Sequence, residues 1–245
     1  MHIAVVGGTG FIGSRLVTRL DVAGHTVSSH ARSTHLDLLT GAGLPEALVE
    51  ADVVVNTIDA PSFDEEAPEF FRATTENLLR AAERADVRHV VLLSVVGADR
   101  VPDVAYYRGK VLQENVVKGG PLPYSIVRAT QFMEFVETIA GWTSADDAVR
   151  LPSTLLQPVA AEDVVAFLAE VTTGPPRDAT LDIAGPDVVP LDELGRRLLR
   201  AHRDRREVVT DEEAGVFGAV HPRDAVVTQA PGARLGRVRF EEWLG

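Results

Sequence analysis

Short apolar runs alternate with longer segments of helical periodicity along the first half of the chain. The runs are rich in β-branched residues and are bounded by glycine and polar residues, which is typical of buried strands. They predict strands at residues 3–6, 26–29, 52–58, 87–93 and 124–127. Apolar residues recur at helical spacing within 11–23, 64–85 and 104–117. This alternation predicts an α/β fold with a doubly wound, Rossmann-type parallel sheet.

The pattern changes after about residue 129. Residues 146–158 have a loop-like composition, residues 161–172 and 191–201 show helical spacing, and residues 179–184 are consistent with a strand. We therefore expect two domains, a Rossmann core over residues 1–130 and a small C-terminal lobe over residues 131–245. The helix at 161–173 is expected to pack back on the core.

The composition narrows the chemistry that is available to the chain. Hydrophobic residues make up 45% of its 245 residues and charged residues 24%, as in an ordinary folded globule. The chain has no cysteine, which excludes thiol nucleophiles, zinc–thiolate sites, iron–sulfur clusters and disulfides. The seven histidines show no metal-ligand spacing, so we expect no metal.

Charge and hydropathy bear on partners and location. A net charge of −12 argues against a nucleic-acid partner, which needs a basic face. No apolar run approaches the ~20 residues of a membrane helix, and no basic stretch precedes the first apolar run, as it would in a signal peptide. We expect a cytoplasmic monomer or homodimer without a membrane partner.

Glycines at positions 7, 10 and 13 follow the first predicted strand and open the first predicted helix. In such a turn one glycine allows the tight bend, one lets the backbone approach a pyrophosphate, and one lets the helix pack closely. The helix N-terminus then presents N–H groups and a partial positive charge of about one half to the phosphates. The alternative interpretation is a merely tight turn. The predicted dinucleotide-binding residues are Gly7, Thr9, Gly10, Phe11, Ile12 and Gly13.

The end of the second predicted strand bears on the choice of dinucleotide. A site that prefers NAD places an Asp or Glu there to bind the ribose hydroxyls, and this chain has none over residues 27–33. Arg32 and Ser33 can instead hold a 2′-phosphate, the arginine by charge and the serine by a hydrogen bond. The sequence therefore favours NADP as the cofactor, with NAD as the alternative.

A serine, a tyrosine and a lysine follow the predicted strand at 87–93. Ser94 comes at the end of that strand, and Tyr106 follows twelve residues later. Lys110 is four residues beyond Tyr106, which places both side chains on one face of a helix, one turn apart. Tyr107, three residues before Lys110, is the less favoured alternative to Tyr106.

With these residues the sequence resembles the short-chain dehydrogenase/reductase superfamily, in particular its extended and atypical NAD(P)-binding members described as NmrA-like. The matching features are the glycine spacing, the strand that ends near Asn56, the segment 77–82, Ser94, the Tyr106–Lys110 pair and the segment 126–130. The resemblance implies that Ser94, Tyr106 and Lys110 are catalytic and that Asn56 and Asp37 bind the cofactor, Asp37 at the adenine. Asn77 matches a helix asparagine of the family whose role is often partly structural.

The resemblance implies hydride transfer between a nicotinamide and a carbonyl carbon. A lysine ammonium about 5 Å away would lower the pKa of the Tyr106 phenol by up to ~2 units and so promote proton exchange. Lys110 would also bind the nicotinamide ribose. Ser94 would donate a hydrogen bond to the substrate oxygen.

The segment after the strand at 124–127 is the predicted substrate wall. Its aromatic residues favour a small apolar or aromatic carbonyl compound over a charged sugar nucleotide. The alternative is that these aromatics are core residues of the C-terminal lobe. The predicted substrate-binding residues are Thr130, Gln131, Phe132, Phe135 and Trp142.

Three functions are consistent with these sequence features. The first is an NADP-dependent oxidoreductase that interconverts a small carbonyl compound and its alcohol. The second is an NmrA-like sensor or regulator that binds the dinucleotide without turnover. The third is an NAD(P)-dependent isomerase or epimerase, whose relatives in the family normally carry a longer substrate lobe.

Overall fold

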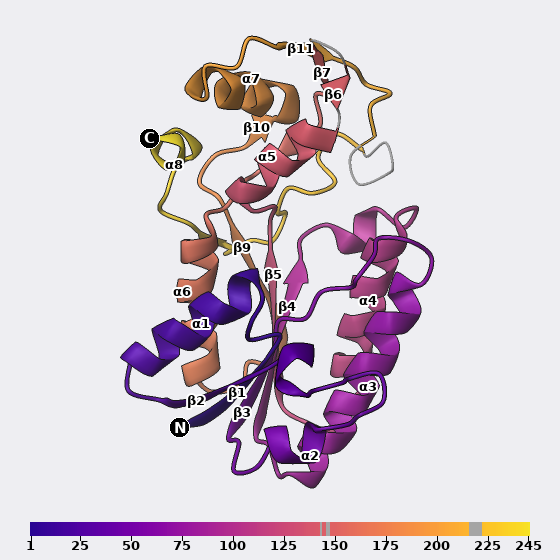
Figure 1. The fold of residues 1–245 in the computed structure, drawn as a ribbon, viewed down its shortest axis with the longest axis vertical. Helices are drawn as coiled ribbons and strands as arrows, with labels where there is room; N and C mark the ends of the chain where they lie inside the picture. The colour runs from indigo at the N-terminus through magenta and orange to yellow at the C-terminus, as the bar shows by residue number, and fades with distance from the viewer. Residues whose placement is uncertain (143, 146–147, 216–221) are drawn as a thin grey trace. The chain divides into compact units, whose positions relative to one another are not determined.

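The computed structural model describes residues 1–142, 144–145, 148–215 and 222–245 (Figure 1). The chain forms two compact units. Unit 1 comprises residues 1–94, 105–128 and 165–181, and unit 2 comprises residues 95–104, 129–164 and 182–245. Both units are discontinuous along the chain, so the division at residue 130 stays a prediction.

Seven strands form the main sheet, in the order β12-β9-β5-β4-β3-β1-β2. β1 pairs in parallel with β2 and with β3, and β3 pairs in parallel with β4. The predicted doubly wound parallel α/β fold is confirmed. The strands are β1 (His2–Val6), β2 (Thr26–His30), β3 (Val53–Asn56), β4 (His89–Val95), β5 (Tyr124–Ala129), β9 (Ala179–Ala184) and β12 (Arg234–Leu235).

Helices cover both faces of the sheet in unit 1. Figure 1 shows α1 (Phe11–Val22) and α6 (Ala161–Thr173) on one face, and α3 (Ala67–Arg84) and α4 (Ala105–Lys118) on the other. α3 and α4 approach closely at Gly109, where an added Cβ would lie 2.6 Å from Cδ2 of Phe71. Two short elements, η1 (Arg32–Thr34) and α2 (Leu44–Ala47), lie between β2 and β3.

The central strands of unit 1 are buried on both faces. All residues of β1 after His2, and residues 53–55 of β3, are at most 1% exposed. Continuous burial of this kind explains why these strands are unbroken runs of β-branched and other apolar residues rather than alternating patterns.

The order of the strands reverses between β1 and β3. The chain passes from β1 to β2 on one side and then crosses to β3 on the other side of β1. In open α/β sheets, ligands bind outside the carboxyl ends of the strands at such a switch point. The residues that follow β1 and β3 therefore lie where this fold binds ligands.

Unit 2 corrects one expectation from the sequence. Residues 148–156 contain two strands rather than loop, because Val149 and Leu151 are buried while Arg150 between them is exposed, which is the period of a strand. β7 pairs in parallel with β11 and antiparallel with β6, and β8 pairs antiparallel with β10. Besides β12, the elements that lie wholly within this unit are η2 (Ala98–Arg100), α5 (Met133–Trp142), β6 (Ser144–Ala145), β7 (Ala148–Leu151), β8 (Leu155–Leu156), β10 (Val189–Pro190), α7 (Leu191–Ala201), β11 (Glu207–Thr210) and α8 (Phe240–Leu244).

Candidate active site

The glycine turn after β1 folds back on itself. Gly7 has a φ of +83°, a backbone conformation that favours glycine. The N–H groups of Gly7 and Gly8 donate to the carbonyl of His30 at 2.8 and 3.2 Å, and the N–H of Gly10 donates to the carbonyl of Gly7 at 2.9 Å. The end of β2 thus holds the turn in place.

Several positions of this turn have no room for a side chain. A Cβ on Gly13 would lie 2.2 Å from the carbonyl oxygen of Gly7, and a Cβ on Gly8 would lie 2.4 Å from Oγ of Ser29. Gly10 is the N-cap of α1 and makes no side-chain capping bond. The N-terminus of α1 carries a partial positive charge, and the backbone of the glycine turn beside it is not covered by side chains. Both features favour the binding of a phosphate group.

Two buried polar atoms flank this turn without a partner among the described residues. Asn56 ends β3, and its Oδ1 accepts the N–H of Ile58 at 3.1 Å, while its Nδ2 has no partner. Nε2 of His30, at the end of β2, is also unpartnered, and burial lowers the pKa of this histidine. A buried polar atom without a partner costs about 1–3 kcal/mol, so a bound polar ligand would stabilise this region. The glycine cradle and these atoms fit a dinucleotide.

Arg32 and Ser33 lie in η1, shortly after β2, and both residues are exposed. Oγ1 of Thr34 accepts the N–H of Ala31 at 2.8 Å and fixes the turn that presents them. The structure describes no acidic side chain between residues 26 and 34, where a site preferring NAD places one. Arg32 and Ser33 are therefore available for a 2′-phosphate.

Asp37 shapes a turn of its own. Its Oδ1 accepts the N–H groups of Leu39 and Thr40 at 2.9 and 3.4 Å. Asn77 of α3 donates to the carbonyls of Leu38 and Leu39 at 2.8 and 2.9 Å, so it ties this turn to the helix. The structure thus gives Asn77 a positioning role, and the adenine contact of Asp37 stays a prediction.

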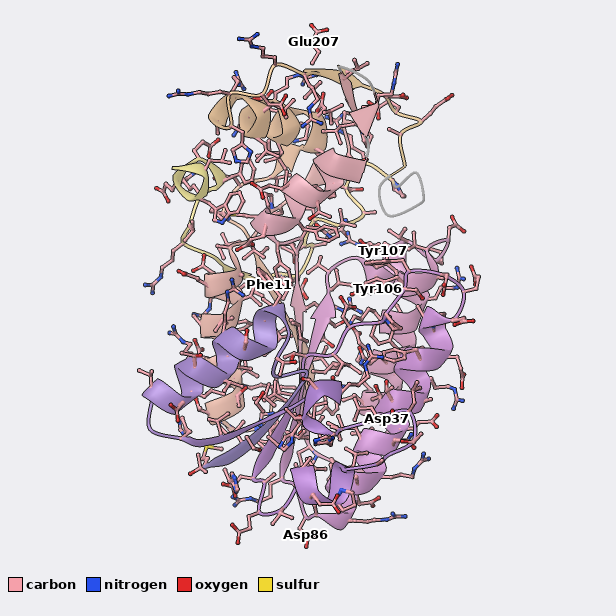
Figure 2. All side chains as sticks on the ribbon, viewed as in Figure 1. Phe11, Asp37, Asp86, Tyr106, Tyr107 and Glu207 are labelled. Atoms are coloured by element: carbon pink, nitrogen blue, oxygen red, sulfur yellow. The ribbon has the colours of Figure 1, made fainter. Side chains whose placement is uncertain are left out.

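Tyr106 lies in the first turn of α4, at the same end of unit 1 as Phe11 and opposite Asp86 (Figure 2). The carboxylate of Asp59, three residues beyond the end of β3, is close enough to help raise the pKa of Tyr106. Its ring packs against Phe63 and Phe71, with centroid distances of 4.8 and 5.6 Å. Asp59 was not predicted from the sequence.

Lys110 lies one turn further along α4 and is 4% exposed. Its Nζ lies 4.4 Å from the centroid of the Phe71 ring and 5.9 Å from that of Tyr106. It donates to Oε1 of Gln113 at 3.1 Å and to the carbonyl of Leu93 at 3.4 Å. Tyr106, Lys110 and Asp59 thus form one polar cluster among aromatic rings.

The pKa of Tyr106 differs from the expectation drawn from the sequence. Burial raises it well above its usual value, and the negative charge of Asp59 raises it further. The expectation that Lys110 lowers it was therefore wrong for this arrangement. Burial also lowers the pKa of Lys110, although the carboxylates of Asp59 and Glu114 favour its charged form. Tyr106 is a neutral phenol at neutral pH.

Ser94 has a different partner from the one expected. β4 extends to Val95, so Ser94 is still within the strand and its side chain lies on the face covered by α4. Its Oγ donates to Oε1 of Glu114 at 2.7 Å. Burial by itself would raise the pKa of Glu114, but hydrogen bonds from Arg128, Ser94 and Lys118 outweigh this effect and lower it. The single hydroxyl proton of Ser94 thus stabilises a buried carboxylate, and the catalytic role of Ser94 stays a prediction.

The predicted substrate residues belong to unit 2. Thr130 and Gln131 are buried; Oγ1 of Thr130 donates to the carbonyl of Gln157, and no partner for the side-chain amide of Gln131 is present in the described part of the chain. Phe132 and Phe135 are partly buried. The side chain of Trp142 lies outside the described residues. Substrate contact by these residues stays a prediction.

No cluster of three metal-ligating side chains occurs in the parts of the chain that the structure describes. The arrangement in unit 1 instead offers a phosphate cradle, an exposed arginine, and a phenol–ammonium–carboxylate cluster. These are the parts of a site for a dinucleotide and for proton exchange.

A comparison with protein-family models finds a match over more than half of the chain. Residues 7–175 match the family model described as NAD(P)H-binding. The chain belongs to the NAD(P)H-binding family. The predicted dinucleotide cofactor is thereby confirmed, whereas the choice of NADP over NAD is not decided by this match. No curated protein sequence matches the chain.

Solved structures share the fold of this NAD(P)H-binding protein over nearly its whole length. dTDP-4-dehydrorhamnose reductase from Bacillus anthracis, in complex with NADP, covers 99% of this chain and 96% of its own at 15% identity and a TM-score of 0.76. UDP-N-acetylglucosamine 4-epimerase from Bacillus cereus covers 100% and 98% at 16% identity and a TM-score of 0.75. A short-chain dehydrogenase/reductase superfamily protein from Agrobacterium tumefaciens, with bound NAD, covers 100% and 95% at 16% identity and a TM-score of 0.75. These likenesses confirm the predicted Rossmann-type α/β fold.

Replacement of Gly13 by alanine tests the cradle. The new methyl group would collide with the carbonyl of Gly7, so we expect the variant Gly13→Ala to lose about 1–3 kcal/mol of unfolding free energy. We also expect its affinity for NADPH to fall at least about tenfold, since the turn must open. Urea unfolding and NADPH fluorescence titration measure the two effects.

The matched control is Gly141→Ala in α5, where a Cβ meets no atom within 4 Å. We expect this variant to keep both the stability and the NADPH affinity of the parent protein. Equal behaviour of the two variants would contradict the proposed role of Gly13 in the cradle.

Proposed function

We propose that this NAD(P)H-binding protein is an NADP-dependent oxidoreductase that interconverts a small carbonyl compound and its alcohol. The observation that carries the proposal is that unit 1 contains both the glycine cradle and the Tyr106–Lys110 pair. Both follow the carboxyl ends of parallel strands, β1 and β4. This is the edge at which open α/β sheets bind their ligands.

Each side chain has a chemical task in this proposal. A bound NAD(P)H supplies the hydride. The neutral phenol of Tyr106 donates its proton to the substrate oxygen as negative charge develops there. The ammonium of Lys110, which is held in a poorly solvated environment, favours that charge electrostatically.

NADP is the proposed cofactor because a cation, and no carboxylate, follows β2. Arg32 lies in η1 and has a guanidinium that matches a phosphate group. The hydroxyl of Ser33, the next residue, adds a hydrogen-bond donor.

A small apolar or aromatic compound is the proposed substrate. The exposed ring of Phe63 beside Tyr106 supports this choice, since it offers an apolar surface next to the proton donor. The proposed substrate contacts are Thr130, Gln131, Phe132, Phe135 and Trp142.

A second candidate is an isomerase or epimerase that uses the cofactor transiently. The fold similarity to UDP-N-acetylglucosamine 4-epimerase supports this candidate, and it would imply a nucleotide-sugar substrate. A sensor of the NmrA-like branch, without turnover, is the third. A fold alone does not distinguish these three chemistries.

The proposal includes a cytoplasmic location, a monomer or homodimer, and no nucleic-acid partner. The net charge of −12 supports the last point. Among the described residues, no helix combines the length and the apolar character that crossing a membrane requires.

The preference for NADP is tested with the variant Arg32→Ala. Loss of a charged hydrogen bond to phosphate costs about 1.5–3 kcal/mol, so we expect the Kd for NADPH to rise about 10- to 100-fold. The Kd for NADH should stay unchanged. Arg84→Ala, at the end of α3, is the control and should leave both constants unaltered. A parallel loss for NADPH and NADH would contradict the assignment of Arg32.

The oxidoreductase proposal is tested with the variant Tyr106→Phe. We expect it to bind NADPH normally and to lose turnover about 10²- to 10⁴-fold, because the proton donor is missing. The assay uses a panel of aromatic and aliphatic ketones and aldehydes together with one UDP-sugar. Tyr107→Phe is the matched control and should retain turnover.

Three outcomes are informative. Net NADPH oxidation that depends on Tyr106 supports the reductase. Conversion of the UDP-sugar without net NADPH oxidation supports the epimerase instead. Tight NADPH binding by the parent protein with no turnover of any compound supports the sensor.

A further inference from the structure

Gln113 is a buried polar residue beside the tyrosine–lysine pair that neither this motif nor the glycine motif explains. It belongs to α4 and is 0% exposed. Thr75 of α3, which contacts its side chain, is also 0% exposed. A buried amide or hydroxyl costs free energy unless it is hydrogen-bonded, so polar side chains at these two positions require partners.

The side-chain amide of Gln113 links Lys110 to α3. Its Oε1 accepts a hydrogen bond from Nζ of Lys110 at 3.1 Å, three residues away on the same helix face. Its Nε2 donates to Oγ1 of Thr75 at 3.3 Å. The opposite orientation of the amide would set its N–H groups against the ammonium. Thr75 therefore helps to keep the oxygen of Gln113 turned toward Lys110.

The ammonium of Lys110 also has contacts with β4 and α3. Its Nζ donates to the carbonyl of Leu93 at 3.4 Å and lies 4.4 Å from the centroid of the Phe71 ring. The bond to Gln113 is the shorter of these two hydrogen bonds. Because Lys110 is only 4% exposed, the oxygen of Gln113 takes a place that water would fill at the surface.

The charged and titratable groups near this ammonium come from two elements. Tyr106 and Glu114 belong to α4, and Asp59 lies in the loop after β3. Burial lowers the pKa of Lys110, and the two carboxylates act in the opposite direction. β4 and α3 contribute a carbonyl and an aromatic ring, which carry no charge. The charged form of Lys110 thus depends on nearby acceptors, and Gln113 is an acceptor that is itself held in place.

We propose that Gln113, oriented by Thr75, is a positioning residue that holds the ammonium of Lys110 in place beside Tyr106. No bond to Gln113 or Thr75 forms or breaks in the reaction, and both act through Lys110. This inference rests on the proposed function, in which that ammonium favours the negative charge that develops on the substrate oxygen.

The test follows the titration of Lys110 in the protein without substrate or cofactor. The chain has only two lysines, so ¹³Cε-lysine labelling gives two NMR signals, and Lys118→Arg identifies one of them. In Gln113→Leu the ammonium loses an acceptor, so we expect the midpoint of the Lys110 signal to fall by about 1–2 pH units. The Lys118 signal should stay unchanged, since that lysine binds Glu114 instead. An unchanged midpoint of Lys110 would overturn the proposal.

The variant Thr75→Val tests the same link from α3. It removes the oxygen that orients Gln113, so the midpoint of Lys110 should fall, by less than in Gln113→Leu. Thr74→Val is the matched control, because Thr74 is equally buried and its hydroxyl donates to the carbonyl of Phe70 within α3. This control should leave the midpoint unchanged. If Gln113→Leu does not fold, equal midpoints in the two threonine variants would overturn the proposal.

The variant Gln113→Glu separates the acceptor oxygen from the packing of the side chain. It keeps the length of the side chain and an oxygen that accepts from the ammonium. The midpoint of Lys110 should therefore be at least as high as in the parent protein. A fall as large as that of Gln113→Leu would contradict the role of Gln113 as an acceptor.

The pH dependence of turnover gives the second readout, with any ketone or aldehyde that the panel identifies. Because burial lowers the pKa of Lys110 and raises that of Tyr106, Lys110 loses its proton first. In Gln113→Leu the fall of kcat at high pH should move to lower pH by about the same 1–2 pH units.

The two readouts separate this inference from the proposed function. If the midpoint of Lys110 falls but no compound is turned over, the positioning role stands and the oxidoreductase proposal fails. If turnover requires Tyr106 while Gln113→Leu changes neither the midpoint nor the pH profile, the oxidoreductase proposal stands and the positioning role is wrong.

Discussion

The turn between β1 and α1 has no room for a side chain, and the rest of the candidate site depends on that constraint. Because Gly13 lacks a Cβ, the first turn of α1 packs directly against the backbone of Gly7. This contact directs the helix N-terminus to the carboxyl end of β1, next to the ends of β2 and β3. A phosphate held there places the two halves of a dinucleotide on either side of β1, which is the arrangement that the strand order of this fold permits.

The ionisation of Tyr106 and Lys110 depends on two opposing influences, burial and the charges of neighbouring groups. Aromatic rings surround Tyr106 and Lys110, and burial acts against the charged form of each. Asp59 supports the ammonium and holds the phenol in its neutral form. A neutral phenol is a proton donor, whereas a phenolate is a proton acceptor. The neutral phenol of Tyr106 is therefore suited to donate a proton.

Local sequence signals predicted the parts of the site that depend on one turn or one helix. The glycine spacing predicted the turn because all three glycines lie within seven residues and each is needed where the backbone leaves no room for a Cβ or has a positive φ. Tyr106 and Lys110 were paired in the prediction because a spacing of four puts two side chains on one helix face, and the structure places both in α4. Asp59 was missed because it comes near Tyr106 only through the packing of β3 beside β4, and no spacing in the sequence records proximity over 47 positions.

Two differences between prediction and structure concern strands. The strand predicted at 87–93, with Ser94 at its end, continues to Val95 as β4, and the hydroxyl of Ser94 donates to Glu114. The strands at 148–151 and 155–156 were missed because they are short and lie among proline and polar residues. Strand ends depend on pairing with neighbours that a single sequence does not reveal.

The transfer of deuterium from NADPH labelled at C4 of the nicotinamide tests the proposed hydride transfer most directly. The labelled cofactor is incubated with the protein and a carbonyl compound, and mass spectrometry of the alcohol product detects the label. We expect one deuterium on the former carbonyl carbon when the cofactor carries the label on the face that is transferred. Products that gain no deuterium from cofactor labelled on either face would contradict this mechanism.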